Sequence, residues 1–308
     1  MLSLAAFVLV ASAAGSVPDY PAPLGEALAK ATSGRACSDA DRAKVVLSPE
    51  MAYWLGRAAT ERMLEHYAQP NRVPVIFEPD TVAATYLAQI GFTLVEATSS
   101  AEHPSTAESP LRGFHFMLVR DPVPNAWSFP GGFVVLTDGL LMRASSEEQV
   151  AGLLAHELAH LRDGHVSNLW REALCRQRGK KEKGAEVQAD LLIGLALKAV
   201  ADTGLGPTLE AEADAEATRN LELAGYSAMG LADYLSHTEH DSLNAGVAKR
   251  HPPSGDRTKA IADQLEAEKL TAAAHSPHEH DRDVRFMQVM VESGLRPDWK
   301  PVLDFYRR

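Results

Sequence analysis

The feature that most constrains this chain is the stretch LLAHELAHLRDGH, residues 153–165, in which three histidines and one glutamate stand among leucines and alanines. His156 and His160 are four residues apart, so on a helix they lie one turn apart on one face and can bind a single ion. Glu157 follows His156 directly and projects beside the pair, within reach of a water bound to that ion. The order His-Glu-x-x-His therefore predicts two zinc ligands and a general base on one helix.

A catalytic zinc ion usually has three protein ligands and an open position for water, so a third ligand is expected elsewhere. The segment LEAEADAEA, residues 209–217, offers Glu210 and Asp214, again four residues apart on one helical face. Glu210 can complete the metal site, and Asp214 can orient one of the ligating imidazoles. His165 is the alternative third ligand, but the helix break at Gly164 leaves the direction of its side chain open.

Each segment also has a plainer interpretation. The first can be a core helix whose histidines form ordinary hydrogen bonds, although Glu157 would then also need a buried partner. The second can be a solvated acidic helix face. The presence of both segments in one chain favours the metal site, with one zinc ion per chain.

Composition and charge narrow the class of protein. The chain has 308 residues, of which 45% are hydrophobic and 23% charged, as in soluble globular proteins with a sizeable core. Its net charge of −11 predicts an acidic surface that repels phosphate backbones, so a nucleic-acid partner is not expected.

Cys37 and Cys175 are too few for a disulfide scaffold and lack metal-site spacing. They form either one disulfide or two free thiols.

The N-terminus predicts export. Residues 2–10 are apolar, and small residues with an Ala-x-Ala pattern follow at 11–13, as in a secretory signal peptide. The run is too short to span a bilayer, and no basic residue precedes it, so a buried N-terminal helix is the alternative. We expect residues 1–14 to be a signal peptide and the mature chain to be periplasmic or secreted.

Residues 185–202 form the most apolar segment after the N-terminus, but four charged side chains within them would be costly in hydrocarbon. The segment predicts an amphipathic helix packed on the domain. Contact of this helix with a membrane surface or an envelope protein stays open. No other segment is typical of a transmembrane helix, so none is expected in the mature chain.

Helices dominate the expected secondary structure. Ser48 as N-cap and Pro49 at the first helical position predict a helix over 48–68. Ser145 with Glu148 predicts a capping box at the start of the helix that carries the His-Glu-x-x-His motif. That helix should run to Arg162 and end before Gly164. Another helix is expected over 208–224, and further helices at the C-terminus.

Strands are few and short. Residues 71–78 and 114–120 have the composition of strands, and an amphipathic helix is expected between them over 80–96. Within 125–141, a Pro-Gly-Gly turn joins two strands, and an Asp-Gly turn follows the second. The fold class is therefore α+β, mainly helical with a small antiparallel or mixed sheet.

The motifs NAWSFPGGFVVLTDGLL, HELAH and EAEAD, in this order along the chain, resemble the zinc metallopeptidase family of CAAX prenyl endopeptidases and HtpX. The resemblance covers roughly residues 75–260 and is strongest to soluble BepA-like and mitochondrial Oma-type members. It implies a zincin-like metalloprotease domain. By this resemblance His156, His160 and Glu210 match the family's zinc ligands, Glu157 its catalytic base, and Asp214 its supporting carboxylate.

The segment RHPPSGDR, residues 250–257, resembles a further element of the same family. The resemblance implies that His251 lies near the zinc, as a transition-state contact or a reversible fourth ligand, and that Arg257 braces the site. From chemistry alone, a histidine before two prolines lies in an extended loop and can simply be at the surface. The histidines of the tail sequence HSPHEH, at 275–280, are expected to have at most incidental metal affinity.

The expected function is zinc-dependent hydrolysis of peptide bonds in misfolded or extended envelope proteins. Glu157 would take a proton from the attacking water and deliver it to the leaving amine, with His251 helping to stabilise the oxyanion. The substrate backbone would pair with a strand edge between Asn125 and Phe129, a mode with little sequence preference. The transmembrane helices of some family members are missing here, so processing of prenylated proteins is not implied.

Two other functions compete with this one. A chaperone-like assembly and quality-control factor could use the same scaffold with latent or conditional proteolysis, although a pure binder has no need for Glu157. A zinc-stabilised structural module would usually have four Cys or His ligands, and the cysteines are too few.

We expect four regions: a signal peptide at 1–14, a linker and helix at 15–70, the metallopeptidase domain at 71–270 and a helical tail at 271–308.

Overall fold

The computed structural model describes most of the chain between residues 45 and 306. The described ranges are 37–38, 45–67, 76–99, 110–177, 193–194, 196, 204–238, 254–270 and 278–306. The expected signal peptide at 1–14 and His251 lie outside these ranges. Of the apolar segment 185–202, only residues 193, 194 and 196 are described.

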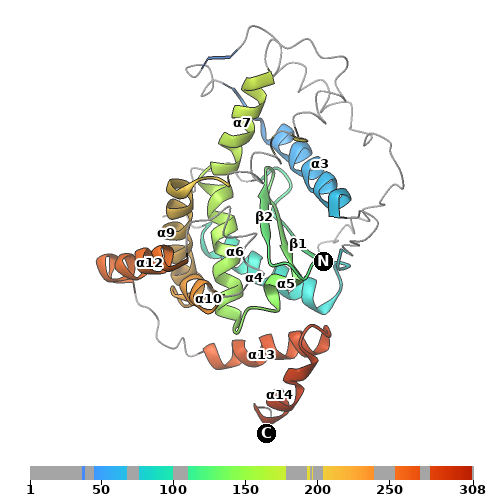
Figure 1. The fold of residues 1–308 in the computed structure, drawn as a ribbon, viewed down its shortest axis with the longest axis vertical. Helices are drawn as coiled ribbons and strands as arrows, with labels where there is room; N and C mark the ends of the chain where they lie inside the picture. The colour runs from blue at the N-terminus through green and yellow to red at the C-terminus, as the bar shows by residue number, and fades with distance from the viewer. Residues whose placement is uncertain are drawn as a thin grey trace.

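Helices make up most of the described structure, with a small sheet near the middle of the chain (Figure 1). In chain order the elements are α3 (Pro49–Tyr67), α4 (Val82–Ala97), β1 (His115–Val119), β2 (Ala126–Phe129), β3 (Phe133–Thr137), α5 (Asp138–Leu141), α6 (Glu147–Arg162), α7 (His165–Gln177), α9 (Pro207–Leu223), α10 (Gly230–Thr238), α12 (Ser254–Glu268), α13 (Glu279–Glu292), η2 (Pro297–Trp299) and α14 (Lys300–Tyr306). The expected α+β class with a small mixed sheet is confirmed.

The sheet has three strands in the order β1-β3-β2. β3 is parallel to β1 and antiparallel to β2, and the Pro-Gly-Gly turn at 130–132 joins β2 to β3 as expected. Gly131 has φ +75°, and a Cβ there would lie 2.4 Å from the Cα of Tyr53, so this turn needs glycine where it meets α3. Of the strand expected over 71–78, the described part contributes only an isolated bridge between Ile76 and Val119.

The central strand β3 separates two hydrophobic clusters. All five of its residues are buried, and their side chains alternate between the two faces of the sheet. Val134 and Leu136 join a cluster with α4, α6, α10 and α13. Phe133 and Val135 join a second cluster with α3 and α7. The sheet therefore positions α6 on one face and α3 on the other (Figure 1).

Helix α6 carries the His-Glu-x-x-His motif, and its start differs by one residue from the expected capping box. The N-cap is Ser146, whose Oγ accepts a hydrogen bond from the Gln149 N–H at 3.3 Å. The Gln149 side chain in turn accepts one from the Ser145 N–H at 2.9 Å. Glu148 has no part in the cap, because its carboxylate is bound by residues far away in the sequence. The helix ends at Arg162, and Gly164 has φ +73°, as the sequence predicts.

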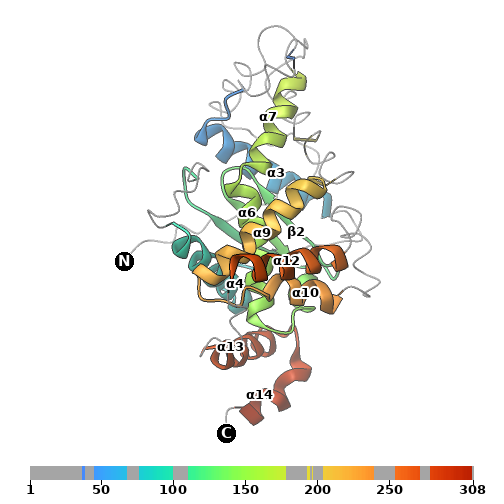
Figure 2. The ribbon, with the colours of Figure 1, turned by 90° about the vertical axis from the view of Figure 1, so that its left-hand side faces the viewer.

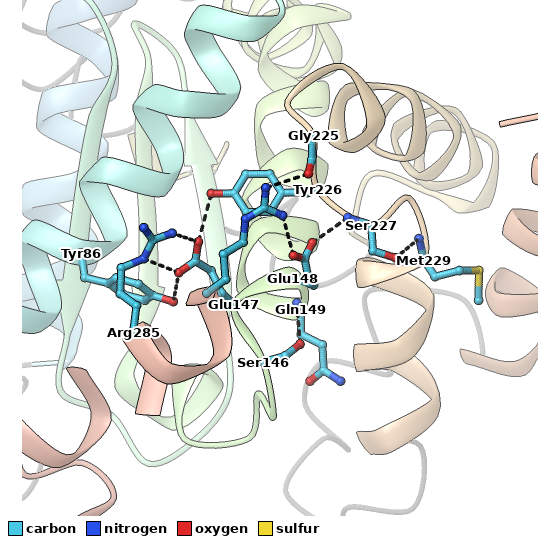
Figure 3. A network of polar contacts seen from close by, with 11 residues as sticks. Tyr86, Ser146, Glu147, Glu148, Gln149, Gly225, Tyr226, Ser227, Met229 and Arg285 are labelled. Atoms are coloured by element: carbon cyan, nitrogen blue, oxygen red, sulfur yellow. Dashed lines mark hydrogen bonds and ion pairs between the residues drawn. The ribbon is translucent and has the colours of Figure 1, made fainter. Parts of the chain in front are cut away.

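The first turn of α6 is held by helix α13 near the C-terminus (Figure 3). Glu147 is fully buried and accepts hydrogen bonds from Tyr86, at 3.1 Å, and from Arg285 Nε, at 2.8 Å. Glu148 accepts from Arg282, at 2.6 Å, and from the Ser227 N–H, also at 2.6 Å. These contacts satisfy two buried carboxylates, which would otherwise be costly inside the protein.

A second difference from the sequence expectation lies just after β3. Asp138 and Gly139 begin the short helix α5 instead of forming a turn. The Thr137 hydroxyl accepts a hydrogen bond from the Leu140 N–H at 3.3 Å, and the Asp138 carboxylate accepts one from the Asp121 N–H at 2.9 Å. Side-chain capping by Thr137 thus favours the helical turn over a hairpin-type turn.

Cys37 and Cys175 form a disulfide, which settles the two alternatives left by the sequence. It joins residues 138 positions apart and fixes the last turn of α7 to the start of the described chain. Within the described ranges, no helix combines the length and the apolar character needed to cross a membrane.

Candidate metal centre

Helices α6 and α9 bring three possible metal ligands together. The Nε2 atoms of His156 and His160 are 3.1 Å apart, and the Glu210 carboxylate lies 3.4 Å from the first and 3.5 Å from the second. All three side chains are buried. Tetrahedral zinc with bonds of ~2.05 Å separates its ligand atoms by about 3.3 Å, so these distances fit such an ion. This is the only group of three such residues within ligand distance in the described part of the chain.

The close packing of α6 on α9 explains why these side chains meet. Ala159 on α6, and Ala213 and Ala217 on α9, are completely buried, and their small side chains let the two helices approach. Glu210 lies in the first turn of α9, one helical turn before Asp214, so both carboxylates face α6. Figure 2 shows α9 and α12 on the side of α6 that is turned toward the viewer.

Asp214 and Arg257 lie directly behind His156. The Asp214 Oδ1 atom is 2.9 Å from His156 Nδ1, the ring nitrogen that does not face the other ligands. Arg257, on α12, donates to both oxygens of Asp214, from Nε at 2.7 Å and from a terminal nitrogen at 2.6 Å. Arg257, Asp214 and His156, all singled out in the sequence, thus form one line of hydrogen bonds that ends at a possible metal ligand.

The charges of these three residues, Arg257, Asp214 and His156, shift the pKa of each of them. Burial opposes ionisation of Asp214, but the hydrogen bonds from Arg257 and His156 outweigh it and lower its pKa to about 2. Burial also opposes protonation of His156, yet Asp214 and Glu210 raise its pKa to about 9 in the metal-free protein. Burial disfavours the charge of Arg257, but Asp214, Glu210 and Glu157 raise its pKa. The site is therefore strongly biased toward binding positive charge.

Glu157 lies on the same turn of α6 as His156 and is buried, with 6% of its surface exposed. No group among the described residues donates a hydrogen bond to its carboxylate. A buried carboxylate with no committed donor can accept a proton from a water held nearby. In this it differs from Glu147 and Glu148 at the other end of the helix, whose carboxylates accept hydrogen bonds from arginines.

His165 does not join the three ligand atoms. It is the first residue of α7, and its Nδ1 lies 3.0 Å from Nδ1 of His160. Its Nε2 lies 3.2 Å from a carboxylate oxygen of Glu212. The sequence indicated neither the contact with His160 nor the one with Glu212. Glu212 is two residues from Glu210, and a helix places such neighbours on different faces, so a contact of Glu212 near the site was not expected.

The expected substrate-binding strand is β2, an edge strand of the described sheet that packs against α6. Asn125 and Phe129, its expected limits, are both buried. The Asn125 carbonyl accepts from the Thr137 N–H at 3.0 Å, so by alternation the backbone groups of Ala126 and Ser128 point away from β3. The Asn125 side chain already accepts the Ala126 N–H at 3.0 Å. Ser128 therefore offers both of its backbone groups to the free edge.

Two other expectations concern histidines outside this cluster. His251 lies outside the described residues, as does His275 of the tail. His280 is on α13, where its ring packs 5.5 Å from that of Tyr306, and so belongs to a different part of the molecule.

Comparisons with known proteins show which family the chain belongs to. The model of peptidase family M48 matches residues 93–265, which include both helices of the metal cluster. A Vibrio cholerae protein named for a beta-barrel assembly-enhancing protease is 27% identical over 257 residues, or 77% of this chain. The beta-barrel assembly-enhancing protease of Escherichia coli K12 is 29% identical over 106 residues, which cover 34% of this chain and 20% of that protein.

A shorter match reaches a mitochondrial protein. The mitochondrial metalloendopeptidase OMA1 of Schizosaccharomyces pombe is 46% identical over 43 residues, 14% of this chain and 13% of that protein. The alignment with the Vibrio cholerae protein covers 49% of that protein, so the chain spans about half the length of this relative.

Proposed function

This chain belongs to peptidase family M48, a family of metalloproteases, and from this premise we propose that it is a zinc-dependent endopeptidase acting on exported proteins. The observation that carries the proposal is the arrangement of three buried ligand atoms within 4.8 Å of one another, beside the uncommitted carboxylate of Glu157. Two imidazoles and one carboxylate form a donor set that suits zinc, which prefers nitrogen and oxygen ligands in a tetrahedral site.

The metal would be held by His156, His160 and Glu210. When bound, zinc supplies Lewis-acid chemistry that makes water and the peptide carbonyl more reactive at neutral pH. Asp214 accepts a hydrogen bond from the Nδ1–H of His156 and so keeps Nε2 of that ring turned toward the other two ligands, while Arg257 holds Asp214 in its ionised form. His251 stays proposed as an additional polar contact to the reacting group.

Glu157 would act as the general base and then as the general acid. It accepts a proton from the water that attacks the peptide carbonyl and passes it to the leaving amine when the C–N bond breaks. Its burial lowers the local dielectric and strengthens its interaction with a nearby proton donor. Because no donor in the described structure occupies its carboxylate, this proton transfer needs no prior breaking of a hydrogen bond.

The substrate would add to the free edge of β2 as an extended strand. The N–H and C=O of Ser128 would form main-chain hydrogen bonds with it, and such bonds are independent of the substrate's side chains. This mode selects segments that are already unfolded or extended. Misfolded envelope proteins are therefore the proposed substrates.

The place of action is proposed to be outside the cytoplasm, in the periplasm or the medium. A disulfide such as Cys37–Cys175 persists in oxidising compartments, which agrees with the expected signal peptide. We keep the four proposed regions at 1–14, 15–70, 71–270 and 271–308. Contact with an envelope protein or a membrane surface stays part of the proposal.

A second function is favoured by the names of the relatives. They are called assembly-enhancing proteases, so a chaperone-like role in envelope assembly, with proteolysis that is latent or conditional, is the alternative.

Cleavage of a permanently unfolded protein, such as reduced and alkylated casein, tests the proposal. We expect cleavage by the zinc-loaded chain, loss of cleavage with 1,10-phenanthroline, and no cleavage by the Glu157→Gln variant with its zinc content intact. An active Glu157→Gln variant would contradict the role of Glu157. A zinc-loaded chain that binds casein but never cleaves it would favour the assembly factor.

A further inference from the structure

The structure assigns a role to two residues outside the metal cluster: we propose that His165 and Glu212 are positioning residues that hold the imidazole of His160. They form the chain Glu212–His165–His160, in which each polar contact is 3.2 Å or shorter. The inference rests on the proposed metal site, because it concerns how one of its ligands is kept in place.

The geometry places His165 behind His160, on the side away from the other ligands. The Nδ1 atoms of the two rings are 3.0 Å apart, whereas Nε2 of His160 faces His156 and Glu210. The ring planes meet at 64°, so the contact is made by nitrogen atoms and not by stacked faces. His165 itself is buried, with 4% of its surface exposed.

The hydrogen atoms can be assigned along this chain from the chemistry of imidazole. A neutral imidazole that offers Nε2 to a metal carries its proton on Nδ1, so Nδ1 of His160 must donate. Nδ1 of His165 must then accept, which places the proton of His165 on Nε2. That proton is donated to the Glu212 carboxylate at 3.2 Å. Each donor has an acceptor, and the orientation of His160 follows.

The two histidine ligands are therefore supported in different ways. His156 is held directly by Asp214, which is buried and bound by Arg257. His160 is held through a second imidazole, and the chain ends on Glu212, whose side chain is 56% exposed. An exposed carboxylate contributes less than a buried one because water and salt screen its interaction. We therefore expect His165 to matter more than Glu212.

The position of His165 depends on the turn between α6 and α7. Gly164 has φ +73°, a conformation that ends α6 and starts α7 at His165. The first side chain of α7 is thereby directed back toward the last turn of α6. The far end of α7 is fixed by the disulfide at Cys175, so the helix is anchored at both ends.

Zinc affinity, measured by competition with a chromophoric chelator on the purified chain, tests the proposal. The His165→Phe variant keeps the bulk of the ring but removes the acceptor, and we expect zinc to bind 10- to 100-fold more weakly. In the His165→Asn variant, Oδ1 replaces Nδ1 as an acceptor, so most of the affinity should return. Glu212→Ala should weaken zinc binding by only about threefold, less so at high salt.

Glu216→Ala is the matched control. This acid lies one turn after Glu212 on α9 and pairs with Arg219, so its loss should leave zinc affinity unchanged. Two readouts separate positioning from general stability. The melting temperature of the metal-free variants should stay near that of the wild type, and the visible spectrum of the cobalt-substituted His165→Phe protein should change.

The possible results divide clearly. Wild-type zinc affinity in His165→Phe overturns the inference, as does a fall in metal-free stability without any change in affinity. If His165→Phe does not fold, Glu212→Ala decides instead: zinc binding as tight as in Glu216→Ala overturns the inference, and the expected threefold weakening supports it. A wild-type chain that binds no zinc would instead contradict the proposed function itself.

Discussion

Arg257 holds Asp214 with two hydrogen bonds, of 2.7 and 2.6 Å, and thereby joins helix α12 to helix α9 directly behind His156. Both side chains are buried. The same two helices are joined a second time at the surface, where Arg219 donates to Glu268 from Nε at 2.9 Å. One pair of helices thus carries a buried and an exposed version of the same interaction, and the two can be compared.

We predict that Arg257→Met lowers the free energy of unfolding by about 3 kcal/mol, because it leaves the Asp214 carboxylate buried without its charge partner. Arg219→Met is the control and should cost less than about 1 kcal/mol, since exposed ion pairs contribute little. Urea unfolding of both variants measures the difference. Equal losses would mean that the buried pair has no special part in holding α12.

Glu210→Ala should remove most of the bound zinc, because only His156 and His160 would remain as ligands. Zinc per chain, measured by atomic absorption after dialysis, should fall from about one to near zero. Glu210→Gln should behave similarly, since an uncharged amide is a poor zinc ligand. Full zinc content in Glu210→Ala would reassign the third ligand, and a double variant with His165 would then identify it.

The free edge of β2 can be tested at Ser128. Ser128→Pro removes an outward N–H and should lower kcat/KM for an unfolded substrate about tenfold, mainly through KM. Ser128→Ala changes only the side chain, so its kcat/KM should stay near the wild-type value. Zinc content should be normal in both variants. A similar loss in Ser128→Ala would indicate that the side chain, and not the backbone, contacts the substrate.

The raised pKa of Asp283, on α13, predicts that the stability of the protein depends on pH. Burial, followed by the nearby carboxylates of Glu279, Glu148 and Glu147, raises its pKa from 3.8 to about 6. In the folded protein Asp283 keeps its proton to higher pH than in the unfolded chain. The stability linked to this proton is therefore complete below about pH 4 and is lost as the pH rises through about 6.

Asp283→Asn should remove this loss. After allowance for solvent screening, we expect the variant to be about 1 kcal/mol more stable than the wild type at pH 8 and equal to it near pH 4. Chemical unfolding across this pH range measures the effect. Asp281→Asn, at an exposed position in the first turn of the same helix, should show no such gain.

The disulfide gives a further prediction. It closes a loop of 138 residues, and a cross-link over so long a loop restricts the unfolded chain strongly. A Cys37→Ala/Cys175→Ala variant should lose about 2–4 kcal/mol of unfolding free energy, as should the reduced wild type. Reducing agent should leave the double variant unchanged, and a parallel loss there would point to an effect of the reagent elsewhere.

Local patterns predicted much of the secondary structure. Ser48 and Pro49 placed the start of α3 correctly, and the Ser48 hydroxyl accepts from the Met51 N–H at 3.2 Å. Gly164 marked the end of α6, and the Pro-Gly-Gly turn joined β2 to β3. Each of these features depends on residues within a few positions of one another, so it is visible in a single sequence.

What the sequence did not indicate depends on contacts between distant residues. Glu148 was expected to close a capping box, but Arg282, 134 positions later, binds it instead, and the cap moves to Ser146. The contact between Glu212 and His165 joins residues 47 positions apart on helices whose angle no local pattern fixes. A periodic pattern identifies the buried face of a helix but not the side chain that it meets.

The contacts of the first turn of α6 determine when this helix can be completed during synthesis of the chain. Glu147 and Glu148 are translated well before their partners, since Arg285 and Arg282 follow 138 and 134 positions later. Until those arginines have been made, the helix that bears the proposed general base, Glu157, begins with two acids that resist burial. A nascent chain therefore cannot complete this helix start before residue 285 has been made, and any activity that depends on it begins only afterwards. Such timing would spare the polypeptide that is still emerging.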